Sequence, residues 1–460
     1  MKLSQALRIE ANDVVAFVGG GGKSTAMFQL AHEASQAGKR VLVTTSTRIF
    51  AAQIKLAPAH VTFDSETQTL AEVLPDLDQA IDQHGQVLLI GQTNSDNGKA
   101  FGIAPDVIDT LAQSGHFDLI INEADGSRMR PFKAPAVHEP VISAATTLVV
   151  PVVGLDILGK PLNDETTHRA NRVSQLSGTA LEQPITTDTI VSILNHPEGG
   201  LKQVPSGARV VPLLNKVESS TQLATAQTIA KQLLDQDTQP IEAVALGAVQ
   251  QTEEPITEVW GRTAVVILAA GGSSRFGSPK QLADWQGQTF VERAVDTALA
   301  SQADLRIIVL GAEVKQSQQR INAQPIQIVI NEAWAEGQST SMKAGLAAVP
   351  DSISAVIFSL VDLPRITPDI IDQLISRHRQ TLAPLVWPEF EGKRGNPVLF
   401  DKQLFDQLAK IEGDQGGRPI IKAYQAVAER VKVDDNKILQ DFDDPETLAK
   451  IASTLTPEDD

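Results

Sequence analysis

The sequence predicts an α/β protein made of two consecutive three-layer α/β domains, and three observations support this prediction. The chain has 460 residues, which is more than one hydrophobic core usually organises. Short β-branched runs alternate with amphipathic stretches along its whole length. One β-branched run in each half leads directly into a glycine-rich loop, so each half opens in the same way.

The first domain is expected to span residues 1–250 and to contain a parallel sheet. Strand, helix and strand follow one another here, which requires crossover connections between parallel strands. The predicted buried strands are residues 14–18, 41–45, 87–90, 119–123, 148–153 and 210–214. Two of the predicted helices are residues 24–37 and 222–234. Residues 250–260 read QQTEEPITEVW, a polar and acidic segment that we interpret as a linker.

The second domain is expected over residues 262–460, where the alternation restarts. Its predicted strands are residues 264–269, 306–310, 327–330 and 355–361. Each of them is followed by a loop or a helical segment, which again indicates an α/β architecture.

The composition excludes several classes of protein. The chain has no cysteine, which excludes disulfides, thiolate metal sites and cysteine nucleophiles. Its net charge of −17 opposes binding to a nucleic-acid backbone. No apolar run approaches the length of a membrane span, and the first residues are unlike a signal peptide. We therefore expect a cytoplasmic protein that handles small molecules, without nucleic-acid or membrane partners.

The glycine loop of the first domain predicts a nucleotide phosphate site. Glycines allow a turn in which several backbone N–H groups face one anion, and the following helix adds its dipole. A lysine supplies charge for the outer phosphates, and a serine hydroxyl can bind Mg²⁺. The loop is shorter than the usual P-loop, and a plain strand-to-helix turn is the alternative. The predicted residues are Gly19, Gly20, Gly21, Gly22, Lys23, Ser24 and Thr25.

Carboxylates and cations follow a later strand of this domain. Glu123 and Asp125 could face the phosphates and hold Mg²⁺ directly or through water, and we select Asp125 together with Ser24 as metal residues. An Asp-Gly turn at the strand end is the alternative. The cations that come next, which suit an anionic ligand or a solvated turn equally, are Arg128, Arg130 and Lys133.

Several motifs of the first half resemble one family. VAFVGGGGKST, VLVTTST, NEADGSRMRPFKAPAVHEP and VVGLDILGKPL followed by HR are similar to the selenium-dependent hydroxylase accessory family. The resemblance implies a P-loop-like domain that assists molybdenum hydroxylases, with an apo molybdenum hydroxylase as a partner. Its nucleotide is expected to be ATP or GTP.

The glycine loop of the second domain lacks a Gly-Lys-Ser sequence, so it is not a second P-loop. It is rich in backbone donors and small hydroxyls, and it carries two cations, Arg275 and Lys280. Such a loop can wrap a triphosphate and stabilise charge while an α-phosphate is attacked and pyrophosphate leaves. The predicted nucleotide-binding residues are Leu268, Ala269, Ala270, Gly271, Gly272, Ser273 and Ser274.

As a whole, LAAGxSxRxGxxK resembles the MobA-like nucleotidyltransferases and, within them, the molybdenum cofactor cytidylyltransferases. GQSTSMK, VDLP, RGNP, GDQGGR and DFDDPE match further motifs of this family. The resemblance implies a Rossmann-like fold and places Ser339 and Ser341 near the nucleoside. It also implies Asp362 and Asp443 as Mg²⁺ ligands. The implied residues on the substrate side are Arg394, Gly395, Asp414 and Arg418.

The resemblance implies transfer of CMP from CTP to molybdopterin or Mo-molybdopterin, with Arg275, Lys280 and Asp362 as the catalytic residues. Two alternatives stay open. The acceptor could be another phosphorylated molecule, such as a sugar phosphate. The chain could also be an NTP-dependent cofactor carrier or chaperone with no transferase activity.

We predict that CTP is preferred to GTP, because CTP-using members of the family have Leu-Ala-Ala-Gly at the loop start and this chain has Ala270. Ala270→Gly should weaken the preference without reversing it, since one methyl group changes selectivity by about 1–3 kcal/mol. The measurement is kcat/KM for both nucleotides. Faster turnover of GTP by the wild-type chain would contradict the prediction.

Overall fold

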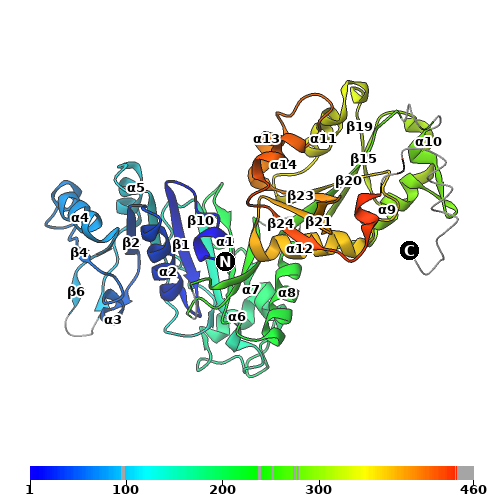
Figure 1. The fold of residues 1–460 in the computed structure, drawn as a ribbon. Coiled ribbons are helices and arrows are strands. Elements are labelled where there is room, and N and C mark those ends of the chain that lie inside the picture. Colours follow the sequence, from blue (N-terminus) through cyan, green and yellow to red (C-terminus); the bar gives the residue numbers. More distant parts are fainter. Residues whose placement is uncertain are drawn as a thin grey trace. The chain divides into compact units, whose positions relative to one another are not determined.

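The computed structural model describes residues 1–94, 99–236, 240–250, 253–272, 276, 279–440 and 442 (Figure 1). The chain divides into two compact units, residues 1–260 and 261–460. No helix within the described ranges combines the length and the apolar character that a membrane span needs.

The first unit contains a parallel sheet with the strand order β4-β5-β2-β8-β1-β10-β13-β14, and β12 also pairs with β10. All of these pairings are parallel, as the sequence predicts. The strands are β1 (Asp13–Gly19), β2 (Val41–Thr45), β4 (His60–Thr62), β5 (Gln86–Ile90), β8 (Leu119–Glu123), β10 (Leu148–Gly154), β12 (Arg209–Val210), β13 (Leu213–Asn215) and β14 (Ala243–Gly247).

Successive side chains of a strand point to opposite faces, and β1 is buried from Asp13 to Val18, so the sheet is covered on both faces. The described helices of the unit are α1 (Leu3–Ala6), α2 (Lys23–Gln36), α3 (Ala51–Ile54), α4 (Leu70–His84), α5 (Pro105–Gln113), α6 (Ala170–Ser177), α7 (Thr187–Leu194) and α8 (Ser220–Leu234) (Figure 1). Short strands complete it, namely β3 (Ile49–Phe50), β6 (Thr93–Asn94), β7 (Lys99–Ala100), β9 (Phe132–Lys133) and β11 (Thr167–His168).

Two segments differ from the sequence-based expectation. The strand predicted at 210–214 is divided into β12 and β13, and Pro212, which has no N–H to donate, lies at the break. The predicted linker is partly a strand, because β15 (Ile256–Ala269) begins inside it. The Ile256 N–H donates to the Met1 carbonyl at 3.1 Å, and the Met1 amino group donates to the Ile256 carbonyl at 2.7 Å. The sequence could not indicate this pairing, since its partners are 255 positions apart.

The second unit has a mixed sheet with the strand order β19-β18-β15-β20-β23-β21-β24, and β22 forms a hairpin with β21. Strand β23 runs antiparallel to both of its neighbours. The remaining strands are β18 (Leu305–Leu310), β19 (Gln327–Ile330), β20 (Ile353–Leu360), β21 (Leu385–Phe390), β22 (Lys393–Arg394), β23 (Val398–Asp401) and β24 (Glu429–Lys432), with the small pair β16 (Asp284–Trp285) and β17 (Gln288–Thr289).

Helices also accompany this second sheet, which confirms the predicted α/β class (Figure 1). They are α9 (Phe290–Ala300), α10 (Val314–Ile321), α11 (Gln338–Ala347), α12 (Pro368–Thr381), α13 (Phe405–Leu408) and α14 (Arg418–Tyr424). Separate hydrophobic clusters contain alternate residues of β15, such as Val265 and Val266, so the two faces of the sheet are packed independently.

Candidate functional site

The glycine loop of the first unit connects β1 to α2 in a conformation that needs glycine. Gly19, Gly21 and Gly22 have φ values of 93°, 84° and 125°, which L-residues rarely adopt. Gly20 is required for a different reason, because a Cβ there would lie 2.6 Å from the carbonyl oxygen of Arg130. The sequence therefore folds this loop tightly against the segment that carries Arg130.

The first three N–H groups of the loop are already used within the protein. Gly19 donates to the Asp125 carboxylate at 3.0 and 3.1 Å, Gly20 donates to the Val152 carbonyl at 2.8 Å, and Gly21 donates to the Arg130 carbonyl at 3.1 Å. The N–H groups available to a phosphate are those of residues 22–25, at the start of α2, where a helix leaves its first donors unpaired. Of the predicted phosphate-binding residues 19–25, the first three therefore already use their N–H groups within the protein.

Lys23 is buried, with only 3% of its side chain exposed, and its ammonium group is enclosed. Its Nζ donates to the Gly19 carbonyl at 2.7 Å and lies 3.2 Å from Asp125 and 3.8 Å from Glu123. Ser24 donates to Glu123 at 2.7 Å and accepts a hydrogen bond from Gln53. The structure therefore brings Ser24 to Glu123, whereas the other predicted metal residue, Asp125, contacts Gly19 and Lys23.

Burial raises the pKa of Glu123, and the charge of Lys23 and the hydrogen bond from Ser24 oppose that rise. A cation bound nearby would favour the charged form of Glu123. Among the described residues there is no cluster of three or more His, Cys, Asp or Glu side chains that could hold a metal ion. A Mg²⁺ ion at this loop would thus need ligands from the nucleotide as well as from Ser24 and Glu123.

A chain of buried ion pairs extends from the loop. Asp125 lies 3.0 Å from Lys133, Lys133 donates to Glu139 at 2.6 Å, and Arg169 donates two hydrogen bonds to Glu139 at 2.7 and 2.9 Å. Burial alone would raise the pKa of Glu139, but Arg169 and Lys133 outweigh it and bring the pKa to about 2. The sequence analysis did not select Glu139 or Arg169, because only the fold brings them together.

A cleft of about 1340 Å³ opens beside this chain of ion pairs. Its lining includes the start of α2 and the loop after β8. Three carboxylates, of Glu123, Glu139 and Asp164, face it. The Lys and Arg residues that line it are more numerous, and they are Lys23, Arg48, Arg128, Arg130, Arg169, Arg172 and Lys216. The cleft is therefore rich in positive charge, although the whole chain carries −17.

The second glycine loop follows β15 in the other unit. Leu268, Ala269 and Ala270 are buried at the end of the strand, whereas Gly271 and Gly272 are exposed. Ser273, Ser274 and Arg275 lie outside the described residues. A Cβ on Gly272 would lie 2.7 Å from the ring of Trp334, a half-buried residue that the sequence analysis did not select. Ala270 belongs to the hydrophobic cluster against which Trp334 packs.

Two of the predicted catalytic residues meet in the second unit. Lys280 Nζ donates to Asp362 Oδ2 at 2.8 Å, although the residues are 82 positions apart. The other oxygen, Asp362 Oδ1, is buried and has no hydrogen-bond partner among the residues that the structure describes. Asp443, the second predicted metal residue, lies outside the described residues. The geometry leaves one carboxylate oxygen without a partner beside a lysine.

The start of α11 carries the residues predicted near the nucleoside. The Ser341 hydroxyl accepts a hydrogen bond from the Asn331 amide at 2.9 Å, while Ser339 Oγ is buried and finds no hydrogen-bond partner among the described residues. Asp414 accepts from the Gln338 N–H at 3.1 Å, so the substrate loop and the start of α11 are joined. A Cβ on Gly337 would lie 2.8 Å from the Gly413 carbonyl, which explains the glycine there.

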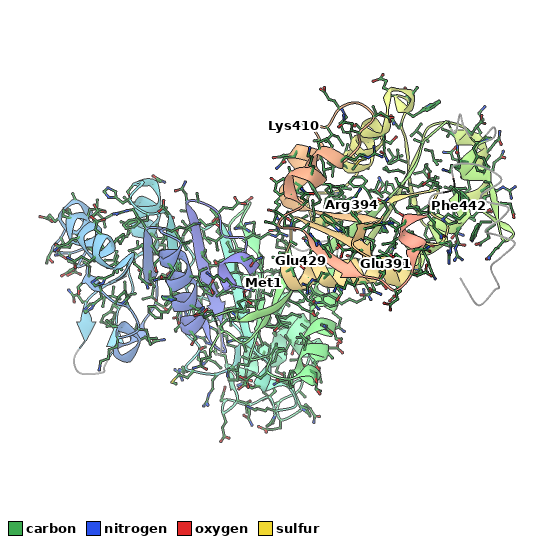
Figure 2. All side chains as sticks on the ribbon, in the orientation of Figure 1. Met1, Glu391, Arg394, Lys410, Glu429 and Phe442 are labelled. Atoms are coloured by element: carbon green, nitrogen blue, oxygen red, sulfur yellow. The ribbon has the colours of Figure 1, made fainter. Side chains whose placement is uncertain are left out.

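The remaining predicted substrate residues lie near β22. Figure 2 labels Arg394 of β22 and Glu391 in the turn between β21 and β22. Partial burial and the charge of Arg418 lower the pKa of Arg394, so the two guanidinium groups repel one another. Neighbouring Gly395 is buried, and a Cβ there would collide with Ile438. Paired cations of this kind suit an anionic substrate.

Two family models match the chain. The model of the YqeC protein matches residues 15–171, and that of the MobA-like NTP transferase domain matches residues 265–428. The uncharacterized protein YqeC of Escherichia coli (strain K12) is 33% identical over 240 residues, which cover 52% of this chain and 88% of that protein.

Two further relatives are more distant. Nicotine blue oxidoreductase of Paenarthrobacter nicotinovorans is 29% identical over 193 residues, 40% of this chain and 94% of that protein. The molybdenum cofactor cytidylyltransferase of Escherichia coli (strain K12) is 27% identical over 183 residues, 39% of this chain and 91% of that protein.

The fold and the matched models define a fusion of two α/β domains, the second of which is a nucleotidyltransferase domain. The chain belongs to the YqeC family and carries a MobA-like NTP transferase domain after its YqeC domain. The sequence motifs predicted a selenium-dependent hydroxylase accessory (YqeC-like) domain followed by a MobA-like nucleotidyltransferase domain. Both resemblances are confirmed.

One prediction concerns His168, which lines the cleft of the first unit. Burial, followed by the charges of Arg169, Lys133 and Arg128, lowers its pKa from 6.5 to about 4. The unfolded chain then binds a proton that the folded chain does not, so stability falls as the pH drops from about 6.5 toward about 4. His168→Gln should remove this loss.

The measurement is the melting temperature of the first unit by calorimetry at about pH 7 and about pH 5. We expect the wild type to lose about 2–4 °C more than the variant between these conditions. His84→Gln, at an exposed position at the end of α4, is the control and should behave like the wild type. Equal losses in the wild type and His168→Gln would contradict the assignment.

Proposed function

We propose that the second unit transfers CMP from CTP to the terminal phosphate of molybdopterin or Mo-molybdopterin, releasing pyrophosphate. The observation that carries this proposal is the contact of Lys280 with Asp362, which leaves Asp362 Oδ1 buried and without a hydrogen-bond partner in the described part of the chain. The MobA-like domain and the similarity to a molybdenum cofactor cytidylyltransferase support it.

The residues present fit a magnesium ion. A buried carboxylate oxygen without a hydrogen bond is costly unless a cation or donor reaches it, and Asp362 Oδ1 is such an atom. Asp362 would hold the ion together with Asp443. When bound, Mg²⁺ offsets charge on the phosphates during the displacement.

Positioning and charge account for the proposed reaction. A terminal phosphate of the acceptor is largely ionised at neutral pH, so an oxygen of this group can attack the α-phosphorus without a general base. One P–O bond forms to the acceptor while the bond to pyrophosphate breaks. Lys280 and Arg275 stabilise the negative charge that moves onto the leaving group.

The alternatives differ in their products. A sugar phosphate acceptor would give a CDP-sugar, and a carrier would give no nucleotide product. The similarity to nicotine blue oxidoreductase adds a redox candidate. Mass spectrometry after incubation with molybdopterin, CTP, GTP and Mg²⁺, together with an assay of redox turnover of nicotine blue, separates these possibilities.

We further propose that the first unit binds ATP or GTP at the start of α2 and assists the maturation of a molybdenum hydroxylase. Residues 22–25 would receive the phosphates, and Lys23 lies at the same helix start. Ser24 and Glu123 would hold Mg²⁺, since the hydroxyl already contacts that carboxylate. This pair replaces our sequence-based choice of Ser24 with Asp125.

We expect Asp362→Asn to lower cytidylyl transfer by about 100-fold or more, because the neutral amide holds Mg²⁺ poorly and no longer pairs with Lys280. The matched control is Asp369→Asn on α12. Its carboxylate is exposed and, among the described residues, accepts a hydrogen bond only from Gln373 on the same helix. The measurement is the initial rate of pyrophosphate release. A folded Asp362→Asn variant with near-normal activity would remove Asp362 from the mechanism.

Lys23→Ala should abolish binding of ATP and GTP to the first unit while cytidylyl transfer continues, because Lys280 and Asp362 are untouched. Since Lys23 also neutralises buried carboxylates, the variant is checked by circular dichroism. Ser24→Ala, which keeps the lysine contacts, provides a second test and should weaken binding only when Mg²⁺ is present. Isothermal titration measures both variants. Unchanged purine nucleotide affinity in both would refute the loop assignment.

A further inference from the structure

The cleft of the first unit has more positive charge than the proposed nucleotide uses. Lys23 lies at the start of α2, and its ammonium group is already surrounded by Gly19, Asp125 and Glu123. Arg128 and Arg130 line the same cleft, and no ion pair or hydrogen bond of their side chains occurs within the described part of the chain. Unpaired guanidinium groups in a concave site favour phosphate or carboxylate ligands.

These two arginines are carried by a segment that lies against the glycine loop. The Arg130 carbonyl accepts the Gly21 N–H at 3.1 Å, and the Pro131 carbonyl accepts the Gly154 N–H at 2.9 Å. Arg128 and Met129 both have positive φ values, 50° and 62°, which are unfavourable for residues other than glycine. The segment is therefore held in a specific conformation beside the proposed phosphate position.

Buried ions fix both ends of this segment. At its start, Asp125 contacts the Gly19 N–H and Lys133, and Lys133 donates to the Gly126 carbonyl at 2.7 Å. Beyond its end, Lys133 also contacts Glu139. The backbone that carries the two arginines is thus held by buried ion pairs at both ends, and both arginines line the cleft.

We propose that Arg128 and Arg130 form a second anion subsite for a phosphorylated small molecule, which binds beside the nucleotide and not in place of it. The inference rests on the proposed nucleotide binding at the start of α2 and gives the first unit a second ligand. Its chemistry is that of a phosphate group, whether free or on a larger molecule. The first unit then brings a nucleoside triphosphate and a phosphorylated molecule together in one cleft.

The experiment is a ³¹P NMR titration of the full chain with inorganic phosphate, in the presence of saturating CTP and a non-hydrolysable ATP analogue. Arg128→Gln/Arg130→Gln should weaken phosphate binding by about tenfold or more, because two charge-assisted contacts are lost. The matched control is Lys2→Gln/Lys231→Gln, which removes two cations of the same unit from outside the cleft. It should leave phosphate affinity unchanged.

The outcomes separate the two proposals. Lys23→Ala that loses the ATP analogue yet still binds phosphate supports the subsite. A wild type that binds no ATP analogue, with phosphate binding still dependent on the two arginines, also supports it and removes only the nucleotide assignment. The subsite is overturned if the double arginine variant binds phosphate like the control. Competition between phosphate and the ATP analogue at a single site overturns it as well.

Discussion

The arrangement of the first unit depends on the carboxylate of Asp125. It accepts the Gly19 N–H and lies within 3.2 Å of both Lys23 and Lys133, so one side chain joins the glycine loop, the start of α2 and the loop after β8. Because these groups are buried, removing one charge leaves its partners uncompensated, which typically costs about 3–5 kcal/mol. The contacts of Asp125 with Gly19 and Lys23 therefore hold the two ends of the glycine loop together.

This constraint separates two kinds of group in the cleft. At the start of α2, Lys23 is matched by carboxylates, and the groups left for a ligand are backbone N–H donors. Arg128 and Arg130, on the segment beside the glycine loop, keep their charge available because Lys133 and Arg169 already satisfy Glu139. Buried pairs therefore organise the site, and unpaired exposed cations are left for ligands.

The second unit uses a simpler arrangement for related chemistry. Lys280 and Asp362 come from distant parts of the chain, and within the described ranges their contact leaves one carboxylate oxygen without a hydrogen-bond partner. Two glycines of this unit are closely packed. A Cβ on Gly272 would collide with the Trp334 ring, and a Cβ on Gly337 would collide with the Gly413 carbonyl. Both units thus place a glycine-rich turn at a strand end, and in the first unit buried ion pairs hold that turn.

The sequence alone determined the α/β class, the two glycine loops and both family resemblances, because these depend on local periodicity and on contiguous motifs. It also selected Lys280 and Asp362, although the contact between them became visible only in the fold. Tertiary structure decided that the Ser24 hydroxyl donates to Glu123 and that Asp125 accepts the Gly19 N–H. It also brought Arg169 to Glu139 and Trp334 close to Gly272. Those outcomes depend on which strand ends lie side by side in the sheet, and chain spacing does not encode that distance.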